Sequence, residues 1–173
     1  MTTLDHPAIS KVAAALREAG LSSAADGIRI LDDDVRTAAA AADALGVEVG
    51  AIANSLVFRA THGDEVLPLL ALTSGAHRAD TTVLAALAGV DEVGRADPAF
   101  VRAHTGQAIG GVAPVGHPHR VHTIVDNALA RHAVIWAAAG HPKSLFPTTH
   151  ADLLALTGGT AAEVAAGEEN RVS

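Results

Sequence analysis

A run of glycine and proline between two ordinary packed segments constrains the fold of this chain more than any other feature. Residues 105–118 read TGQAIGGVAPVGHP, which is four glycines and two prolines in fourteen residues, and Asp126 follows eight residues later. Glycine permits positive φ and close approach of the backbone to another group, and proline then fixes the path of the chain. Such a run is either a tight structural corner or a loop that presents backbone N–H groups to a ligand, and composition favours neither.

The bulk composition predicts a globular protein with a core of small aliphatic side chains. The 173 residues are 49% hydrophobic but only 2% aromatic, so alanine, valine and leucine must fill the interior. This length suits a single α-and-β domain, which we expect to span residues 1–173. No apolar run approaches the roughly 18 residues needed to span a bilayer, and the N-terminus lacks the layout of a signal peptide. We therefore expect a cytoplasmic protein.

Charge and cysteine content exclude several classes of function. The chain has 12 Lys and Arg residues against 19 Asp and Glu residues, and its formal net charge is −7. Broad binding of nucleic acid relies on basic side chains that release counterions, so any contact with a nucleic acid should be local. The sequence contains no cysteine. Disulfides, thiol catalysis and cysteine–zinc sites are therefore excluded.

Capping residues and apolar spacing predict the helices. Each predicted segment starts at a Ser, Thr, Asp or Pro signal or ends at glycine. The predicted helices cover residues 7–19, 37–45 with Thr37 as cap, 80–88, 98–105 after the pair Asp97-Pro98, and a segment capped by Thr148 or Thr149 that ends at Leu156.

Apolar runs between turn residues predict the strands. Residues 52–60 and 66–73 form a hairpin around His62-Gly63-Asp64, and residues 121–125 and 133–138 are buried strands around a helical turn near Asn127. The segment from Thr160 onward has the spacing of a capping box but equally suits an edge strand.

Several familiar sites are missing from the sequence. There is no G-x-S-x-G nucleophile elbow and no H-E-x-x-H metal helix. His117-Pro118 occupies the place where a phosphate loop needs Lys followed by Ser or Thr. His117, His119 and His122 lie within six residues and leave a histidine metal site as a weak alternative. Only Asp126 stands near enough in sequence to complete such a site, so we expect no metal.

Polar residues interrupt otherwise apolar segments at three places. Asn54 and Ser55 lie inside the strand IANSLVF and must face opposite sides of it, so one of them points inward. Asp126 ends an apolar strand, where it either caps the following turn or belongs to a site. Residues 137–149 form a second glycine-containing loop with His141 and Lys143, and the two loops could face each other across a pocket.

Taken in order, these segments resemble the YbaK/ProX family of aminoacyl-tRNA deacylases, which is related to the editing domain of prolyl-tRNA synthetases. The resemblance rests on RTAAAAADALGVEVGAIANSLVF (36–58), RADPAFVRAHTGQAIGGVAPVGHP (95–118), TIVDNAL (123–129), and AAAG followed by HADLLALTG. It covers most of the chain from Arg36 to Gly158. It implies a mixed α/β (α+β) fold in which helices wrap a curved, barrel-like sheet.

The resemblance also implies an activity. Family members hydrolyse the ester that joins a wrong amino acid to the 3′-terminal ribose of tRNA, as a second sieve behind a synthetase. The expected function is a trans-acting deacylase for a small amino acid such as alanine, serine, threonine or cysteine. The expected partners are the aminoacylated tRNA acceptor end and a synthetase, and no cofactor is expected.

The family's G-x-x-x-P loop falls on residues 110–114, and its strand-end aspartate falls on Asp126. In this interpretation the loop supplies N–H donors, Pro114 holds the turn, Asp126 orients substrate or water, and His141 is a conceivable general base. The expected catalytic residues are Gly110, Gly111, Val112, Pro114, Asp126 and Asn54. The expected substrate-binding residues are Thr37, Ser55, His117, Gly140, His141, Lys143 and Ser144.

One position departs from the family pattern. Many members carry lysine in a strand like I-V-K-S-L-V-F, where this chain has Asn54 in IANSLVF. A neutral amide offers ordinary hydrogen bonds where lysine offers charge, although Lys143 could restore a cation from the second loop. The alternative to a deacylase is therefore a non-catalytic binding module of the same fold, for an aminoacyl-adenosine-like ligand or a synthetase.

Overall fold

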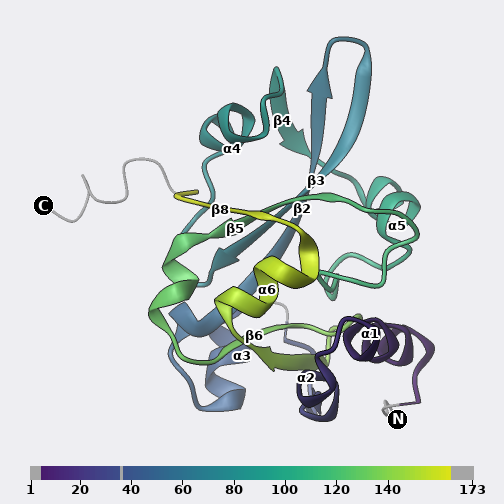
Figure 1. Ribbon diagram of the computed structural model, residues 1–173, viewed down its shortest axis with the longest axis vertical. Coiled ribbons are helices and arrows are strands. Elements are labelled where there is room, and N and C mark those ends of the chain that lie inside the picture. The colour runs from purple at the N-terminus through teal and green to yellow at the C-terminus, as the bar shows by residue number, and fades with distance from the viewer. Residues whose placement is uncertain (1–4, 36, 165–173) are drawn as a thin grey trace, which may run out of the picture.

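The computed structural model describes residues 5–35 and 37–164, and its strands form one curved mixed sheet (Figure 1). The order is β1-β7-β6-β2-β3-β5-β8, with β4 also paired to β2. Within these residues no pairing joins β1 to β8, so the barrel-like sheet stays open. The bounds are β1 Arg29–Ile30, β2 Ile52–His62, β3 Glu65–Ser74, β4 Glu92–Arg95, β5 His122–Asp126, β6 Ile135–Ala138, β7 Ser144–Thr148 and β8 Thr160–Ala162.

The helices begin and end at the signals that the sequence predicts. The side chains of Thr37, Asp80, Asp97 and Thr149 each accept a hydrogen bond from a backbone N–H of the first turn. The same four helices end at glycines with φ between 65° and 72°, which only glycine adopts easily. The bounds are α1 Pro7–Glu18, α2 Ser22–Asp26, α3 Ala38–Leu45, α4 Thr81–Ala88, α5 Pro98–Thr105, α6 His150–Thr157, and the 3₁₀ turns η1 Val49–Ala51 and η2 Asn127–Arg131.

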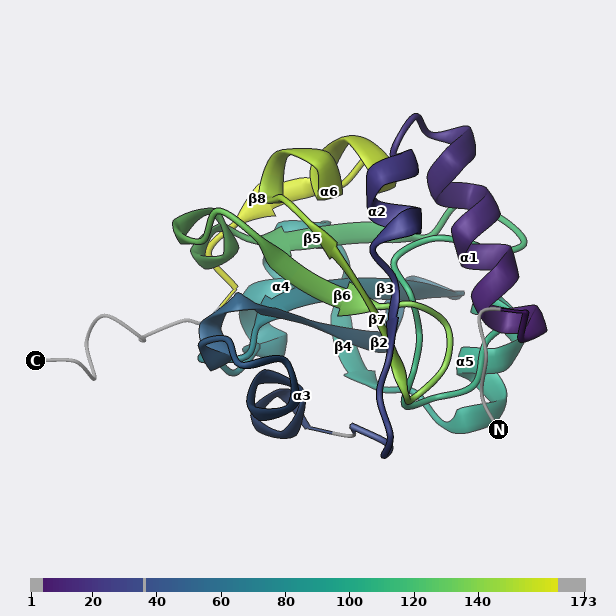
Figure 2. The same ribbon diagram turned by 90° about the horizontal axis from the view of Figure 1, so that it is seen from below.

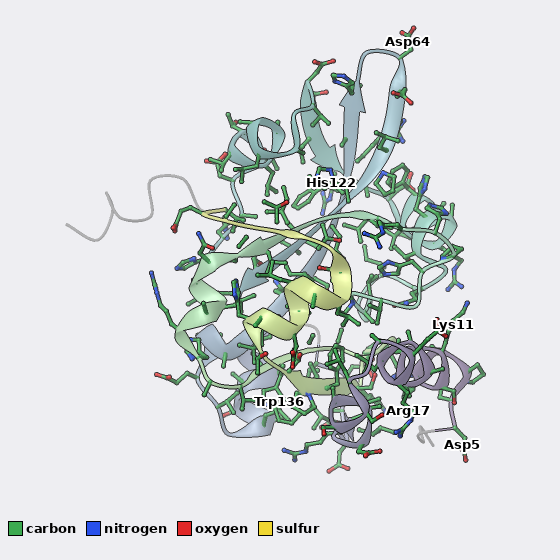
Figure 3. All side chains as sticks on the ribbon, viewed as in Figure 1. Asp5, Lys11, Arg17, Asp64, His122 and Trp136 are labelled. Atoms are coloured by element: carbon green, nitrogen blue, oxygen red, sulfur yellow. The ribbon has the colours of Figure 1, made fainter. Side chains whose placement is uncertain are left out.

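The helices divide between the two faces of the sheet. Helices α1, α2 and α6 lie on one face and α3 lies on the other (Figure 2). The main core, beneath α1, α2 and α6, includes Ile9, Leu16, Leu72 and Phe146. Alternate residues of β3, such as Leu69, pack instead against α4 in a second cluster. Small side chains let these layers approach closely, as the composition predicts. Outside the core, Lys11 and Arg17 project from α1 (Figure 3), and Arg17 pairs with Asp26 of α2 at 2.8 Å.

Four elements differ from the sequence prediction. The prediction omits α2, β1 and β4, and it treats residues 144–148 as loop where the structure has β7. Strand β7 is short and contains Pro147, so it carries no alternating pattern, and its extended form comes from antiparallel pairing with β6. The ambiguous tail is strand β8 over its described part, parallel to β5.

Among the residues that the structure describes, strand β2 has no strand partner along part of one edge. Its other edge pairs with β3 throughout, whereas on this edge the β6 ladder ends at Ala53 and the β4 ladder begins at Phe58. Residues 54–57 therefore border an interval in the sheet. On the β3 side, the Gly75 N–H donates to the Ile52 carbonyl at 2.8 Å. Along a strand, residues whose backbone groups bond to one neighbouring strand alternate with residues whose backbone groups point to the other side. The backbone N–H and C=O of Ser55 consequently point into the interval.

Asp126 joins three segments at the end of β5. It is fully buried, and its carboxylate accepts hydrogen bonds from the N–H groups of Ser74 at 3.0 Å and Ala128 at 2.9 Å. The Nδ1 of His77, itself buried, lies 3.2 Å from the same carboxylate. A buried carboxylate needs such partners because burial removes its hydration. Asp126 therefore links the ends of β3 and β5 to the start of η2.

We predict that Asp126→Ala destabilises the fold strongly. Two buried N–H groups lose their acceptor at about 1–3 kcal/mol each, so the free energy of unfolding should fall by about 2–6 kcal/mol. Urea unfolding followed by circular dichroism measures this, with Asp43→Ala on the exposed face of α3 as the matched control. Equal midpoints for the two variants would contradict the linking role.

Candidate functional site

A cavity of about 270 Å³ opens beside the interval in the sheet. Helix α3, strand β2 and the glycine loop, residues 109–112, form its walls, and we call it the site cavity. It is lined by Val35, Thr37, Ala38, Ala41, Ile52, Ala53, Asn54, Ser55, Leu56, Ile109, Gly110, Gly111, Val112, Ala138 and Leu145. The structure therefore brings together six of the residues that the sequence analysis assigns to the site: Thr37, Asn54, Ser55, Gly110, Gly111 and Val112.

Gln107 holds the glycine loop in place. Its buried side-chain amide accepts a hydrogen bond from the Ala113 N–H at 2.7 Å and donates one to the Val115 carbonyl at 2.9 Å. The Thr105 hydroxyl in turn accepts from the Gln107 N–H at 3.1 Å and donates to the Val101 carbonyl at 2.7 Å. The sequence analysis missed Gln107. A long amide directly after a helix-ending glycine could have indicated it, because such a side chain can bond to both kinds of backbone group.

The glycine loop touches the second loop directly. A Cβ placed on Gly111 would lie 2.7 Å from the carbonyl carbon of His141 and 2.8 Å from the nitrogen of Pro142. Both of these are backbone atoms that cannot move aside alone. The two loops therefore meet, as the sequence analysis suggests, but at Gly111 they are in contact rather than separated by a pocket. Glycine is needed here for close approach.

Several polar groups in or beside the wall of the site cavity have no hydrogen-bond partner among the described residues. The half-buried Asn54 amide makes no hydrogen bond within residues 5–35 and 37–164, and the Ser55 Oγ and Thr73 Oγ1 are buried without one. Thr73 is the cross-strand neighbour of Asn54. Buried polar groups normally have partners, so these unpaired groups in and beside the cavity wall distinguish this part of the sheet.

The glycine loop adds backbone donors to this wall. The N–H groups of Gly110, Gly111 and Val112 donate no hydrogen bond to any described residue, whereas the N–H of the next residue, Ala113, is bonded to Gln107. Gly110 has φ of 99°, so only glycine fits there without strain. The site cavity thus combines the Asn54 amide and free backbone N–H groups with small aliphatic walls.

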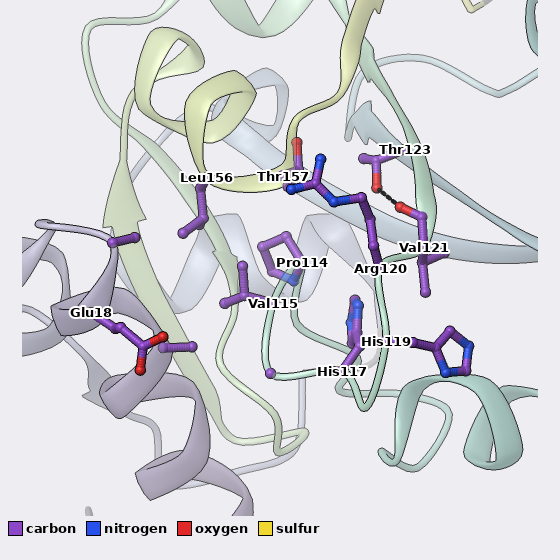
Figure 4. A pocket seen from close by; sticks show the side chains of 13 residues that line it. Glu18, Pro114, Val115, His117, His119, Arg120, Val121, Thr123, Leu156 and Thr157 are labelled. Carbon is purple, nitrogen blue, oxygen red and sulfur yellow. Dashed lines mark hydrogen bonds between the residues drawn. The ribbon is translucent and has the colours of Figure 1, made fainter.

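His117 and Pro114 line a different cavity. Residues of α1, the segment after the glycine loop and α6 enclose about 440 Å³, which we call the histidine cavity (Figure 4). The Nε2 of His117 lies 2.8 Å from the Ala113 carbonyl. Burial lowers the pKa of His117 below its usual 6.5, and nearby His119 lowers it further, against the opposing effect of that carbonyl. His117 is therefore held neutral, with its Nε2–H donating.

The remaining predicted residues do not line the site cavity. His141 Nδ1 accepts a hydrogen bond from the Lys143 N–H at 3.1 Å, and its ring lies edge-on to that of His6. Burial and then the charge of His6 lower the His141 pKa. The buried Ser144 hydroxyl donates to the His141 carbonyl at 3.0 Å. Gly140, with φ of 100°, lies against the Ala8 carbonyl of α1. These residues shape the second loop.

The geometry supports neither the substrate-orienting role predicted for Asp126 nor the weak alternative of a histidine metal site. Asp126, predicted to orient substrate, is buried among backbone N–H groups and does not line the site cavity. Among residues 5–35 and 37–164, no group of three or more His, Asp or Glu side chains is placed to hold a metal ion. Of the three clustered histidines, His122 lies on β5 (Figure 3) and is exposed.

Comparison with known proteins identifies the family. The model of the aminoacyl-tRNA editing domain family matches residues 32–156. The chain belongs to this family. A crystal structure of a candidate trans-editing enzyme for prolyl-tRNA synthetase is 38% identical, with a TM-score of 0.83 over 94% of this chain and 99% of that chain.

Two other structures share the fold. A protein from work on epitope backbone grafting onto scaffold proteins is 37% identical, with a TM-score of 0.84 over 93% of this chain and 99% of that one. A hypothetical protein is 26% identical, with a TM-score of 0.77 over 89% of this chain and 98% of that one. The resemblance and fold given by the sequence analysis are confirmed, and both the Asn54 strand and the glycine loop lie within the matched range.

We predict that Gly111→Ala disrupts the junction of the two loops. The added methyl group meets backbone atoms, so the free energy of unfolding should fall by about 1–3 kcal/mol. Gly94→Ala is the matched control, because a Cβ on Gly94 has no atom within 4 Å and neither glycine has positive φ. Thermal unfolding of both variants measures the effect, and equal melting temperatures would contradict the contact.

We also predict that His117 titrates below pH 6.5. A histidine whose folded pKa is lowered binds fewer protons in the folded than in the unfolded state. Its contribution to stability is therefore complete above about pH 6.5 and decreases as the pH falls, by up to about 1.4 kcal/mol per pH unit. Histidine ring NMR gives the pKa directly, and His117→Gln should flatten the loss of stability on acidification. A measured pKa above 6.5 would refute the assignment.

Proposed function

We propose that this protein is a trans-acting aminoacyl-tRNA deacylase, a carboxylic ester hydrolase that removes a small mischarged amino acid from tRNA. The observation that carries the proposal is a cavity lined by Asn54 and by residues 110–112, whose side-chain amide and backbone N–H groups have no hydrogen-bond partner among the described residues. Membership of the editing-domain family supports it. We also propose a cytoplasmic protein that meets the tRNA acceptor end, delivered by a prolyl-tRNA synthetase. In the described chain, no helix is long and apolar enough to cross a membrane.

The reaction needs little beyond positioning and polarisation. An aminoacyl ester is already reactive, so N–H donors aimed at its carbonyl oxygen stabilise the negative charge that develops there. The oxygen of a water molecule attacks the carbonyl carbon, and the bond to the ribose oxygen breaks. The proton of the water ends on that ribose oxygen, leaving a free amino acid. In this scheme Gly110 and Gly111 are the carbonyl donors, while Asn54 holds the acyl group or the terminal ribose.

The walls of the site cavity support a small side chain. Ala38 and Ala41 of α3 and Ala138 of β6 face it, and its 270 Å³ must also admit part of the ribose. Alanine, serine, threonine and cysteine esters are therefore the substrates to test. The geometry assigns Lys143 no place in this cavity, so Asn54 acts there as a neutral hydrogen-bonding group. Asp126 supports the fold.

We predict that Asn54→Ala lowers kcat/KM for ester hydrolysis about 10-fold, because one neutral hydrogen bond to the substrate contributes about 1 kcal/mol. Asn127→Ala, on the exposed start of η2, is the matched control and should behave as wild type. Deacylation of a panel of alanyl-, seryl-, threonyl- and cysteinyl-tRNA measures both.

Absence of hydrolysis across the panel by folded wild-type protein would overturn the deacylase proposal. The neutral Asn54 would then favour a non-catalytic module that binds an aminoacyl-adenosine-like ligand or a synthetase. Calorimetric titration with a non-hydrolysable aminoacyl-adenosine amide distinguishes these two ligands. A module for the aminoacyl-adenosine-like ligand should give heat of binding with this compound, whereas a module for a synthetase should give none.

A further inference from the structure

A row of rings in tilted and edge-to-face contact begins on α5, where Phe100 and His104 are half-buried, and ends at the exposed His119. The rings of Phe100 and His104 lie 4.4 Å apart, and those of His104 and His119 lie 5.8 Å apart, edge to face. The guanidinium carbon of Arg59 lies 5.5 Å from the centre of the Phe100 ring. We call Arg59, Phe100, His104 and His119 the ring strip. It joins β2, α5 and the segment that follows the glycine loop.

Arginines surround the ring strip without carboxylate partners. Arg59, Arg95, Arg102 and Arg120 are all exposed, and in the described part of the chain none forms an ion pair. The nearby Asp97 carboxylate accepts a hydrogen bond from the Phe100 N–H at 2.8 Å. A chain with net charge −7 thus has a local group of unpaired cations beside aromatic rings.

The strip touches one cavity directly and has another as a neighbour. His119 and Arg120 line the histidine cavity, where Arg120 extends toward Thr157 of α6 (Figure 4). Arg95, next to the strip, lines a mostly apolar cavity of about 210 Å³ that shares Ser55, Leu56, Ile109, Gly110 and Val112 with the site cavity. The surroundings of the strip therefore border the region of the site cavity.

We propose that the ring strip binds the unpaired 3′ end of an RNA strand, with bases stacked on Phe100 and His104. Every base has a flat face, so an aromatic platform beside cations binds single strands with little regard to sequence. Arg59 and Arg95 then pair with phosphates, which guanidinium does well. The inference rests on the proposed function, because it explains how an acidic protein holds the RNA whose terminal ester enters the site cavity.

The test uses a fluorescently labelled RNA of eight nucleotides that ends in ACCA and has no amino acid attached. Its binding to the protein is measured by fluorescence anisotropy at two salt concentrations. Phe100→Leu should weaken binding about 5- to 100-fold, the cost of losing a stacked base. Arg59→Gln should weaken binding and reduce the salt slope by about one. Arg131→Gln, an exposed arginine at the end of η2, is the control and should match wild type. Wild-type affinity in both strip variants would overturn the proposal, and so would failure of wild type to bind.

A kinetic comparison separates this inference from the proposed function. Arg59→Gln should raise KM for an aminoacylated RNA while leaving kcat unchanged, and it should not alter hydrolysis of a 3′-aminoacyl adenosine, which is too short to reach the strip. If wild type hydrolyses neither substrate, the deacylase proposal fails. The anisotropy result alone then decides whether the strip binds RNA. If both substrates respond equally to Arg59→Gln, the strip does not bind RNA. Because Arg59 is exposed, its loss should not unfold the protein.

Discussion

The candidate site depends on the missing strand partner of β2. Between the β6 and β4 ladders, residues 54–57 have hydrogen-bonded neighbours on one side only. An unpaired backbone edge inside a sheet lowers the stability of the fold, because its N–H and C=O groups need hydrogen-bond partners. Here residues 54–56 of this edge and the glycine loop line the same space, which is the site cavity. The cavity is thus a consequence of how the sheet is interrupted.

The buried polar groups beside β3 differ in whether they have hydrogen-bond partners. Asp126 is saturated by backbone donors and holds three segments together. Asn54, Ser55 and Thr73, on the β2 side of β3 and on β3 itself, have no hydrogen-bond partner among the described residues. Leaving such groups unpaired costs stability, so they contrast with the carboxylate that supports the fold. Gln107 belongs with Asp126, because both ends of its amide bond to the backbone of the glycine loop and the segment after it.

Local signals explain which elements the sequence analysis predicted correctly. The caps at Thr37, Asp80, Asp97 and Thr149 act within one helical turn, and the hairpin turn acts within a few residues. A short stretch of sequence is therefore enough to predict them. Strand β7 was missed because its extended form comes from a partner strand, and β4 was missed because a four-residue strand carries little pattern. The six site residues that converge come from segments that the family resemblance had already aligned. Gln107 was missed because its two partners lie in a loop whose path sequence does not reveal.

The sequence by itself determined the family, the helices with their caps, the hairpin, and the need for glycine between residues 106 and 116. These properties follow from backbone conformation and short-range hydrogen bonding, which neighbouring residues control. Tertiary structure alone decided that Asn54 and the glycine loop share a cavity whereas Asp126, His141 and Lys143 stand outside it. It also aligned Arg59, Phe100, His104 and His119, which come from three separate segments. Distance between side chains far apart in sequence depends on strand register and on the packing of whole layers, which no local pattern encodes.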